Sequence, residues 1–184
     1  NFNQPDVKWF IGGKLNITEN CLDRYLADRP DQLAIIWEPN NPNDASRKIT
    51  YEELHKEVCC FANALLKLGV ESCDRVCIYL PMIPEATIAM LACARVGAVH
   101  SVVFAGFSSA SLADRINDSQ CKLLITADAF YRGEKKIELK KIADEAMSQT
   151  PSVKNCVVFN HCHSSVEMKA DRDIGGAMQC KIFR

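Results

Sequence analysis

The sequence predicts an α/β domain with a parallel-type sheet and helices on both of its faces. Short runs of apolar and β-branched residues alternate along the chain with segments of helical periodicity. One central stretch, residues 81–107, contains a helix, a glycine turn, an apolar strand and a loop of small residues in direct succession. Strands that alternate with helices pair in parallel through right-handed crossovers, which place helices on both faces of the sheet. The spacing of the predicted elements along the chain does not reveal the order of the strands in the sheet.

Size and composition narrow the class of protein. The chain has 184 residues, of which 48% are hydrophobic and 24% charged, and its net charge is −1. Such a composition is typical of one soluble globular domain, or of a piece of a larger one. A net charge of −1, with no basic stripe in the sequence, does not indicate a nucleic-acid partner. The longest apolar run, Ile88 to Val99, is interrupted by Arg95 and is too short to cross a membrane.

The ten cysteines do not resemble a disulfide framework. Several lie inside apolar helix or strand patterns, where free cysteine behaves as a small hydrophobe. Because no secretory leader opens the sequence, we expect reduced thiols in a cytoplasmic protein, with the mitochondrial matrix as the alternative. His161-Cys162-His163 is the one metal-like cluster, but its members are too close in sequence to converge on an ion. We expect a surface loop there.

Three segments are expected along the chain. Residues 1–17 have no period and are interpreted as an irregular arm packed on the outside of the domain. Residues 18–160 form the α/β unit. Residues 161–184 are polar and irregular, and are interpreted as a linker or as a truncated continuation.

The first part of the α/β unit is expected to hold two helices and two strands. Thr18 is expected to cap a short helix that ends near Asp28. Leu33–Glu38 is predicted to be the first strand of the sheet. Thr50 and Glu53 form a capping box. It opens a helix whose apolar face comprises Leu54, Val58, Phe61, Leu65 and Leu68. The second strand is predicted at Asp74–Leu80.

The central helix has clear start and stop signals. Pro84 and Glu85 suit a first helical turn, and Gly97 suits the left-handed position that follows a helix. The helix between them is apolar all round, which predicts burial on all faces. Ala98–Phe104 is predicted to be the third strand, also buried.

The remaining elements follow from caps and periodicity. Ser108 or Ser109 is expected to cap the next helix. Three further elements are predicted after it: a strand at Lys122–Asp128, a helix at Lys136–Met147 and a fifth strand at Asn155–Phe159.

Ligands of such folds bind at the carboxyl ends of the strands, where two loops stand out. The first, residues 104–107, has small residues that let a ligand approach the backbone and aromatic rings that can stack on a flat group. In the second, residues 131–135, Arg132 and Lys135 are expected beside free helix N–H groups, a suitable place for phosphate. Each loop alone has an ordinary interpretation, as a tight turn or as a solvated charged loop. Together they suggest a nucleotide-like ligand with its ring near Phe104.

No catalytic centre is apparent. The sequence contains no G-x-x-x-x-G-K-[ST] phosphate loop, no G-x-G-x-x-G motif and no G-x-S-x-G nucleophile elbow. Glu85, His100 and Asp128 lie near strand or helix ends. We interpret them as a helix-dipole partner, a core histidine and a cap. We therefore assign no catalytic residue and no metal ligand to the chain.

Several stretches are similar to the N-terminal region of AMP-forming acetyl-CoA synthetases, which are adenylate-forming enzymes. They are WFIGGKLNITENCLDRYL, AIIWE, ITYEELH, IYLPMIPEATIAMLACARVGAVHSVVFAGFS, DRINDS and LITADAFYRGEK. The resemblance runs from Trp9 to about Phe159, and its most specific part is MLACARxGAxHSxVFAGF. It implies that the chain is part of the large N-terminal domain of such an enzyme.

The resemblance also implies a reaction and a site. The family forms acetyl-AMP and pyrophosphate from acetate and MgATP, and CoA, brought by a mobile C-terminal domain, then displaces AMP. The residues implied in CoA binding are Phe104, Ala105, Gly106 and Ile137 on the adenine side and Arg132, Gly133, Glu134 and Lys135 at the phosphates. Ala105 stands where many members have a glycine. Lys135 stands where many have arginine, so the charge is kept but the bidentate fork is lost.

Other family motifs do not occur in these residues. The phosphate loop T-S-G-[ST]-T-G-x-P-K, the acidic ATP ligands, the acetate-pocket tryptophan and the catalytic lysine would lie beyond Arg184. ATP, Mg and acetate are thus expected to bind only in a missing C-terminal part of the same chain. We expect no ligase activity from these residues alone. A propionate-specific relative, and a non-catalytic module that binds CoA or another adenine nucleotide, are the alternatives.

Overall fold

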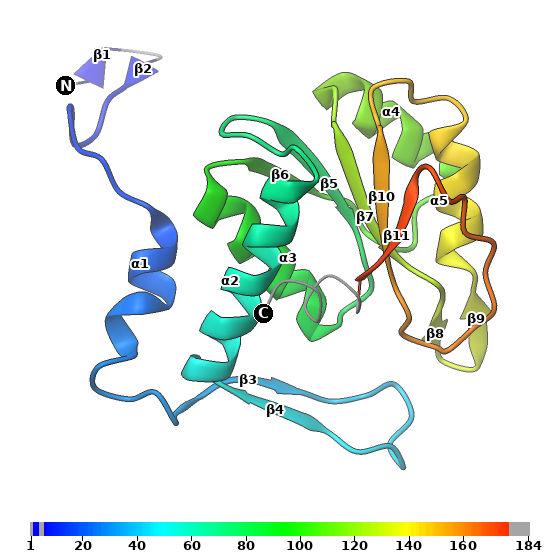
Figure 1. The fold of residues 1–184 in the computed structure, drawn as a ribbon, viewed down its shortest axis with the longest axis horizontal. Helices are drawn as coiled ribbons and strands as arrows, with labels where there is room; N and C mark the ends of the chain where they lie inside the picture. The colour runs from blue at the N-terminus through cyan, green and yellow to red at the C-terminus, as the bar shows by residue number, and fades with distance from the viewer. Residues whose placement is uncertain (1, 4–5, 177–184) are drawn as a thin grey trace.

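The computed structural model describes residues 2–3 and 6–176, and its centre is a five-stranded parallel sheet (Figure 1). The strand order is β11-β10-β7-β5-β6, and every neighbouring pair is parallel. The strands are β5 (Arg75–Tyr79), β6 (Val99–Val102), β7 (Leu123–Ala127), β10 (Asn155–Phe159) and β11 (Asp173–Gly175).

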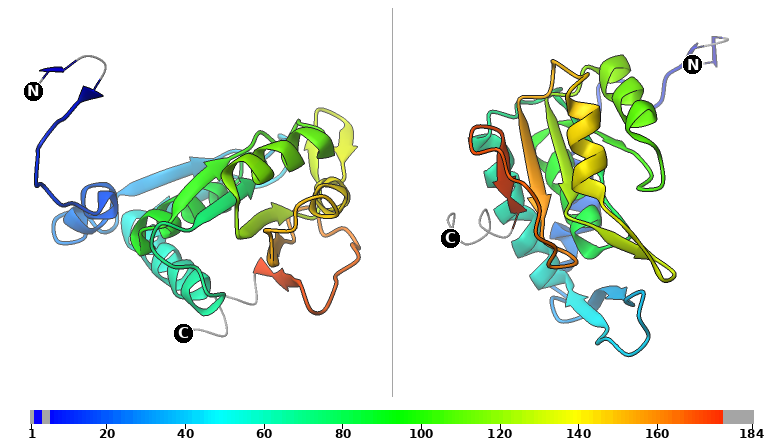
Figure 2. Two further views of the ribbon diagram at one scale, coloured as in Figure 1. Left: turned by 90° about the horizontal axis from the view of Figure 1, so that it is seen from above. Right: turned by 90° about the vertical axis from the view of Figure 1, so that its right-hand side faces the viewer.

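Helices cover both faces of this sheet, which confirms the predicted class. The helices are α2 (Tyr51–Lys67), α3 (Pro84–Val96), α4 (Ser109–Ser119) and α5 (Leu139–Met147). Helices α2 and α3 pack together on one face, and α4 and α5 pack on the other (Figure 2). None of the helices in the described residues is long and apolar enough to span a bilayer.

The strand order places a topological switch between β5 and β7. The chain leaves β5 for β6 on one side, and then returns past β5 to β7 on the other. This is the doubly wound arrangement in which ligands bind at the carboxyl ends of the two strands beside the switch. Spacing could not reveal this order, because it depends on which strands pair.

Local signals decide where the helices begin and end. At the start of α2, the Thr50 hydroxyl accepts the Glu53 N–H at 3.2 Å and the Glu53 carboxylate accepts the Thr50 N–H at 2.9 Å. Pro84 is the first residue of α3, and Gly97 ends it with a φ of +76°. Ser108 caps α4 by accepting the Ser111 N–H. The predicted caps of these three helices are confirmed.

The expectation that Leu33–Glu38 belongs to the main sheet is wrong. Strand β3 (Leu33–Trp37) pairs antiparallel with β4 (Arg47–Thr50) in a separate two-stranded sheet. The polar loop between them lets the chain fold straight back, so no crossover helix follows β3 and parallel pairing is not available. Ile36 remains 60% exposed as a result.

The fifth strand of the main sheet comes instead from the segment expected to be a linker. Strand β11 pairs in parallel with β10, so the sheet continues past residue 160. A charged cluster holds β11 against α5. The buried Lys140 ammonium lies 2.7 Å from Asp144 and 2.9 Å from Asp173, and Arg172 bonds both carboxylates. The part of the linker prediction that covers residues 177–184 lies outside the described residues.

The third predicted strand is less buried than expected. Strand β6 is the last strand in the order, and Val99 and Val102 are 53% and 55% exposed. His100 is exposed on this edge strand and is not a core histidine. Helix α3 is likewise buried along one face, formed by Ile88, Ala89, Ala92 and Cys93, and is only half-buried elsewhere.

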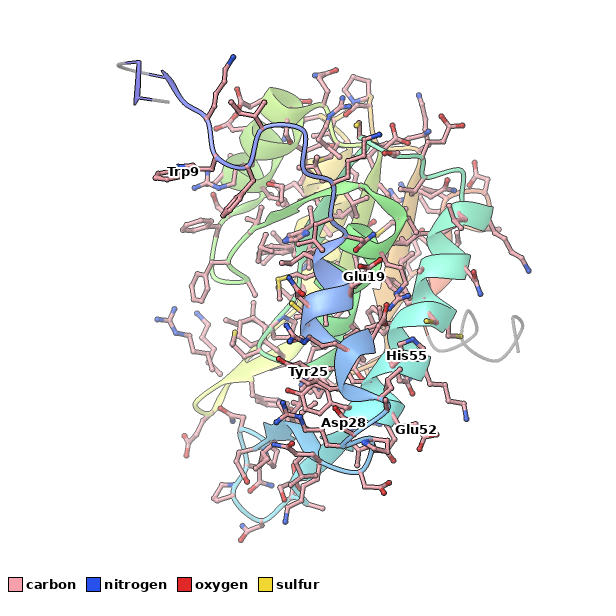
Figure 3. The ribbon with its side chains drawn as sticks, turned by 90° about the vertical axis from the view of Figure 1, so that its left-hand side faces the viewer. Trp9, Glu19, Tyr25, Asp28, Glu52 and His55 are labelled. Atoms are coloured by element: carbon pink, nitrogen blue, oxygen red, sulfur yellow. The ribbon has the colours of Figure 1, made fainter. Side chains whose placement is uncertain are left out.

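The N-terminal arm was expected to pack on the outside of the domain, but several of its apolar side chains are exposed, such as Phe10 at 90% and Ile11 at 73%. It contains the short pair β1 (Phe2–Asn3) and β2 (Asp6–Val7), followed after a stretch without regular structure by α1 (Ile17–Cys21) and a 3-10 turn, Asp23–Tyr25. Trp9 projects from the arm (Figure 3) and is 69% exposed.

Helix α1 is anchored by a different residue from the one expected. Asn16, and not Thr18, caps α1 by accepting the Thr18 N–H at 3.0 Å. The Asn16 amide also donates to the Ala94 and Arg95 carbonyls at the end of α3, at 3.2 and 3.1 Å. The short helix is therefore tied to the body of the domain.

Candidate functional site

The two predicted loops lie on either side of the carboxyl end of β5. Residues 103–108 follow β6, and the hairpin of β8 (Phe130–Arg132) and β9 (Lys135–Ile137) follows β7. Strand β5 lies between β6 and β7 in the sheet. Since neighbouring strands are about 4.8 Å apart, the two segments begin roughly 10 Å apart. They therefore flank the switch point.

A tyrosine of the central strand holds the first loop. The Tyr79 hydroxyl donates to the Phe107 carbonyl at 2.7 Å and approaches the Ala105 carbonyl at 3.3 Å. Tyr79 is fully buried, and burial raises its pKa to about 12, so the hydroxyl keeps its proton at neutral pH. Sequence analysis did not single out this residue.

The loop itself is tightly packed and open on one side. A Cβ atom at Gly106 would come within 2.4 Å of the Phe104 ring, so the ring in this position leaves no room for a side chain there. The Phe104 ring meets Phe107 edge-on at 5.9 Å and is 58% exposed. Arg115 of α4 lies over Phe107, with its guanidinium carbon 4.7 Å from the ring centroid. An exposed ring beside a close backbone suits a flat ligand group.

The second segment is not the loop that the sequence predicts. Strands β8 and β9 form an antiparallel hairpin with Gly133 and Glu134 at its turn, and α5 begins only at Leu139. Gly133 has a φ of +62°, which a two-residue hairpin turn commonly requires. Arg132 and Lys135 are consequently not beside the free N–H groups of a helix.

The hairpin brings the two predicted cations, Arg132 and Lys135, together by strand pairing. Arg132 is directly opposite Lys135, and Phe130 is directly opposite Ile137. Because side chains alternate along a strand, these four residues share one face of the hairpin. Like charges directly opposite each other destabilise a strand pair. In the part of the chain that the structure describes, neither cation has a carboxylate within 4.0 Å, and both residues are exposed to solvent.

The hairpin also borders a cavity of about 1120 Å³, through Phe130 and Tyr131 from its two faces and through its turn. Residues from four segments line it, among them Trp37, Met82, Tyr131 and His161. Of the predicted site residues, only Gly133 and Glu134 reach this cavity. The Asn40 amide donates to the Gly133 carbonyl at 3.0 Å and so ties the β3–β4 loop to the turn of the hairpin. Both hairpins lie at the carboxyl end of the sheet (Figure 1).

Asp128 shapes the wall of this cavity. Its buried carboxylate accepts the N–H groups of His161 at 2.8 Å, Cys162 at 3.0 Å and Ser164 at 2.7 Å. Burial acts to raise the pKa of Asp128, but these hydrogen bonds outweigh burial and lower it. Asp128 thus fixes the loop after β10, and is not the helix cap that we expected. Among the described residues, no three His, Cys, Asp or Glu side chains gather as ligands of one metal ion.

Comparisons with known proteins agree with this architecture. The family model described as "AMP-binding enzyme" matches residues 22–175. The chain is 53% identical to the acetyl-coenzyme A synthetase of Bdellovibrio bacteriovorus over 174 residues, which are 94% of this chain and 27% of that protein. It is 56% identical to the acetyl-coenzyme A synthetase of Nostoc linckia over 174 residues, 95% of this chain and 51% of that protein.

A solved structure is similar as well. The acetoacetyl-CoA synthetase from Streptomyces lividans matches with a TM-score of 0.87 and 28% identity, over 96% of this chain and 26% of that one. The chain therefore spans between about a quarter and a half of the length of these relatives. Because the family model covers most of the chain, the protein belongs to the AMP-binding enzyme family.

Proposed function

We propose that this chain is the N-terminal portion of an AMP-forming acetate–CoA ligase, and that it supplies part of the CoA site. The full enzyme would convert ATP, acetate and CoA to acetyl-CoA, AMP and diphosphate through acetyl-AMP. The relatives at 53% and 56% identity are named acetyl-coenzyme A synthetases, which favours acetate over propionate as the substrate.

The proposed CoA site rests mainly on two cations that lie opposite each other in the hairpin. Arg132 and Lys135 share one face of the hairpin, and no described carboxylate neutralises them. A phosphate between them would accept charge-assisted hydrogen bonds from both side chains. Ile137, on the same face, offers an apolar contact. The open Phe104 ring, with Ala105 and Gly106 beside it, would take the adenine. Gly133 and Glu134 form the turn that sets the spacing of the two cations.

The remaining steps would depend on other parts of the longer protein. The residues here include no ATP phosphate loop, so ATP, Mg and acetate would bind in the missing C-terminal part. That part would be the main partner of this chain, and the chain alone would be inactive as a ligase. Cys77, Cys93, Cys121 and Cys156 are buried free thiols, which supports a reducing compartment, the cytoplasm or the mitochondrial matrix.

Calorimetry with CoA and 3′-dephospho-CoA tests this proposal. If Arg132 and Lys135 hold the 3′-phosphate, its removal should weaken binding by about 1–3 kcal/mol, as expected for hydrogen bonds to a charged group. The pyrophosphate, pantetheine and adenine are common to both ligands and serve as the internal control. Equal affinities would contradict the assignment of the phosphate to this face.

A further inference from the structure

Tyr79 occupies an unusual place for a polar side chain. It is the last residue of β5, with a paired strand on each side, and it is fully buried. Its hydroxyl forms hydrogen bonds with the loop that follows β6, through the Phe107 and Ala105 carbonyls. The hydroxyl therefore links the strand at the switch point to the proposed adenine-side loop.

These contacts act on the backbone of the loop. The two carbonyls lie on either side of Gly106, and both are directed at one hydroxyl. The Phe107 N–H also donates to the Phe104 carbonyl at 3.0 Å, which closes the turn. Since Gly106 lies against the Phe104 ring, a rotation of either peptide group would change the contact between Gly106 and this ring.

We infer that Tyr79 is a positioning residue for CoA: its hydroxyl holds the 104–107 loop in the conformation that receives the adenine. This inference rests on the proposed CoA site. A loop that is already ordered loses less conformational entropy when its ligand binds, so a fixed loop gives tighter binding without any contact between Tyr79 and CoA. Tyr79 would act through Phe104 and Gly106.

A variant series tests the role of the hydroxyl in binding. Tyr79→Phe removes the donor and keeps the ring, and the affinity for CoA should fall about 2- to 12-fold, as for one hydrogen bond. Replacing Tyr79 by 4-aminophenylalanine returns a donor at the same position and should restore most of the affinity. Tyr25→Phe, which deletes a hydroxyl outside this loop, is the matched control and should bind CoA normally. Circular dichroism and urea unfolding establish that each variant is folded.

An unchanged affinity in Tyr79→Phe would overturn the inference, as would failure of 4-aminophenylalanine to restore binding to a folded chain. A second measurement needs no ligand. Hydrogen exchange of the Phe107 amide should be about 2- to 12-fold faster in Tyr79→Phe than in the wild type. Equal exchange would overturn the positioning role even if CoA did not distinguish the variants. The proposed function fails separately, if CoA and 3′-dephospho-CoA bind the wild type equally.

Discussion

The two end strands of the sheet, β6 and β11, differ in how far their side chains are buried. At one edge, the apolar strand β6 is open, and Val99 and Val102 are more than half exposed, at 53% and 55%. At the other, the short strand β11 contains an aspartate, yet the Asp173 side chain is completely buried. Hydrophobic sequence therefore does not decide which edge is covered. Among the described strands, β6 and β11 each have a neighbour on one side only. The difference is that charged groups hold β11 against α5.

Loss of Lys140 should have the largest effect at the closed edge. The Lys140 side chain is 2% exposed and its ammonium lies between Asp144 and Asp173, so Lys140→Met leaves the buried Asp173 carboxylate without this cation. Removal of one partner of a buried ion pair costs about 3–5 kcal/mol, and Arg172 should keep the loss near the lower limit.

The neighbouring lysine provides the control. The Lys141 side chain is 83% exposed and forms only a 3.8 Å pair with Glu138. Lys141→Met should change the free energy of unfolding in urea by less than about 0.5 kcal/mol. Similar losses in both variants would show that the cluster does not hold the closed edge.

Acid should loosen the same edge. Burial acts to raise the pKa of Asp173, but Arg172, the Lys169 N–H and Lys140 outweigh burial and lower this pKa to about 2. An unfolded aspartate titrates near 4, so the stabilisation is complete above about pH 4 and is lost as the pH falls towards 2. The loss should be about 2 kcal/mol.

Unfolding experiments between pH 2 and pH 6 on the wild type and on Asp173→Asn isolate this contribution. The wild type should lose its advantage over the variant as the pH falls. Parallel curves for the two chains would mean that Asp173 titrates normally in the folded state.

Two valine substitutions compare the loss of stability at the open edge with the loss in the interior of the sheet. Val157 on β10 is fully buried, whereas Val102 on β6 is 55% exposed. Val157→Ala should cost about 2 kcal/mol, and Val102→Ala less than about 0.5 kcal/mol. Thermal unfolding of both variants gives the comparison. Equal costs would indicate that β6 is covered in solution, for example by self-association through its edge.

Sequence analysis succeeded where the signal is local. The capping box of Thr50 and Glu53, the proline start and glycine end of α3 and the buried run of β7 each depend on a few adjacent residues. The two loops at the carboxyl ends were also found from sequence, because parallel strands bring their ends to the same edge.

The errors arose where structure depends on distant partners. Whether β3 or β11 joins the main sheet is decided by pairing, and neither run of residues contains that information. Strands β8 and β9 have three residues each, too few to show a period. The buried pair of Lys140 and Asp173 was not identified, because the two residues lie on segments far apart in the chain. The Tyr79 contacts were missed for the same reason.

One measurement tests the central claim most directly: the difference in affinity between CoA and 3′-dephospho-CoA for the wild type, Lys135→Ala and Lys136→Ala. Lys135 shares its hairpin face with Arg132, whereas Lys136 lies on the opposite face, across from Tyr131. We predict that Lys135→Ala loses most of the preference for CoA and that Lys136→Ala keeps it. A preference that survives in Lys135→Ala, or that disappears equally in both variants, would contradict the placement of the phosphate on the Arg132 face.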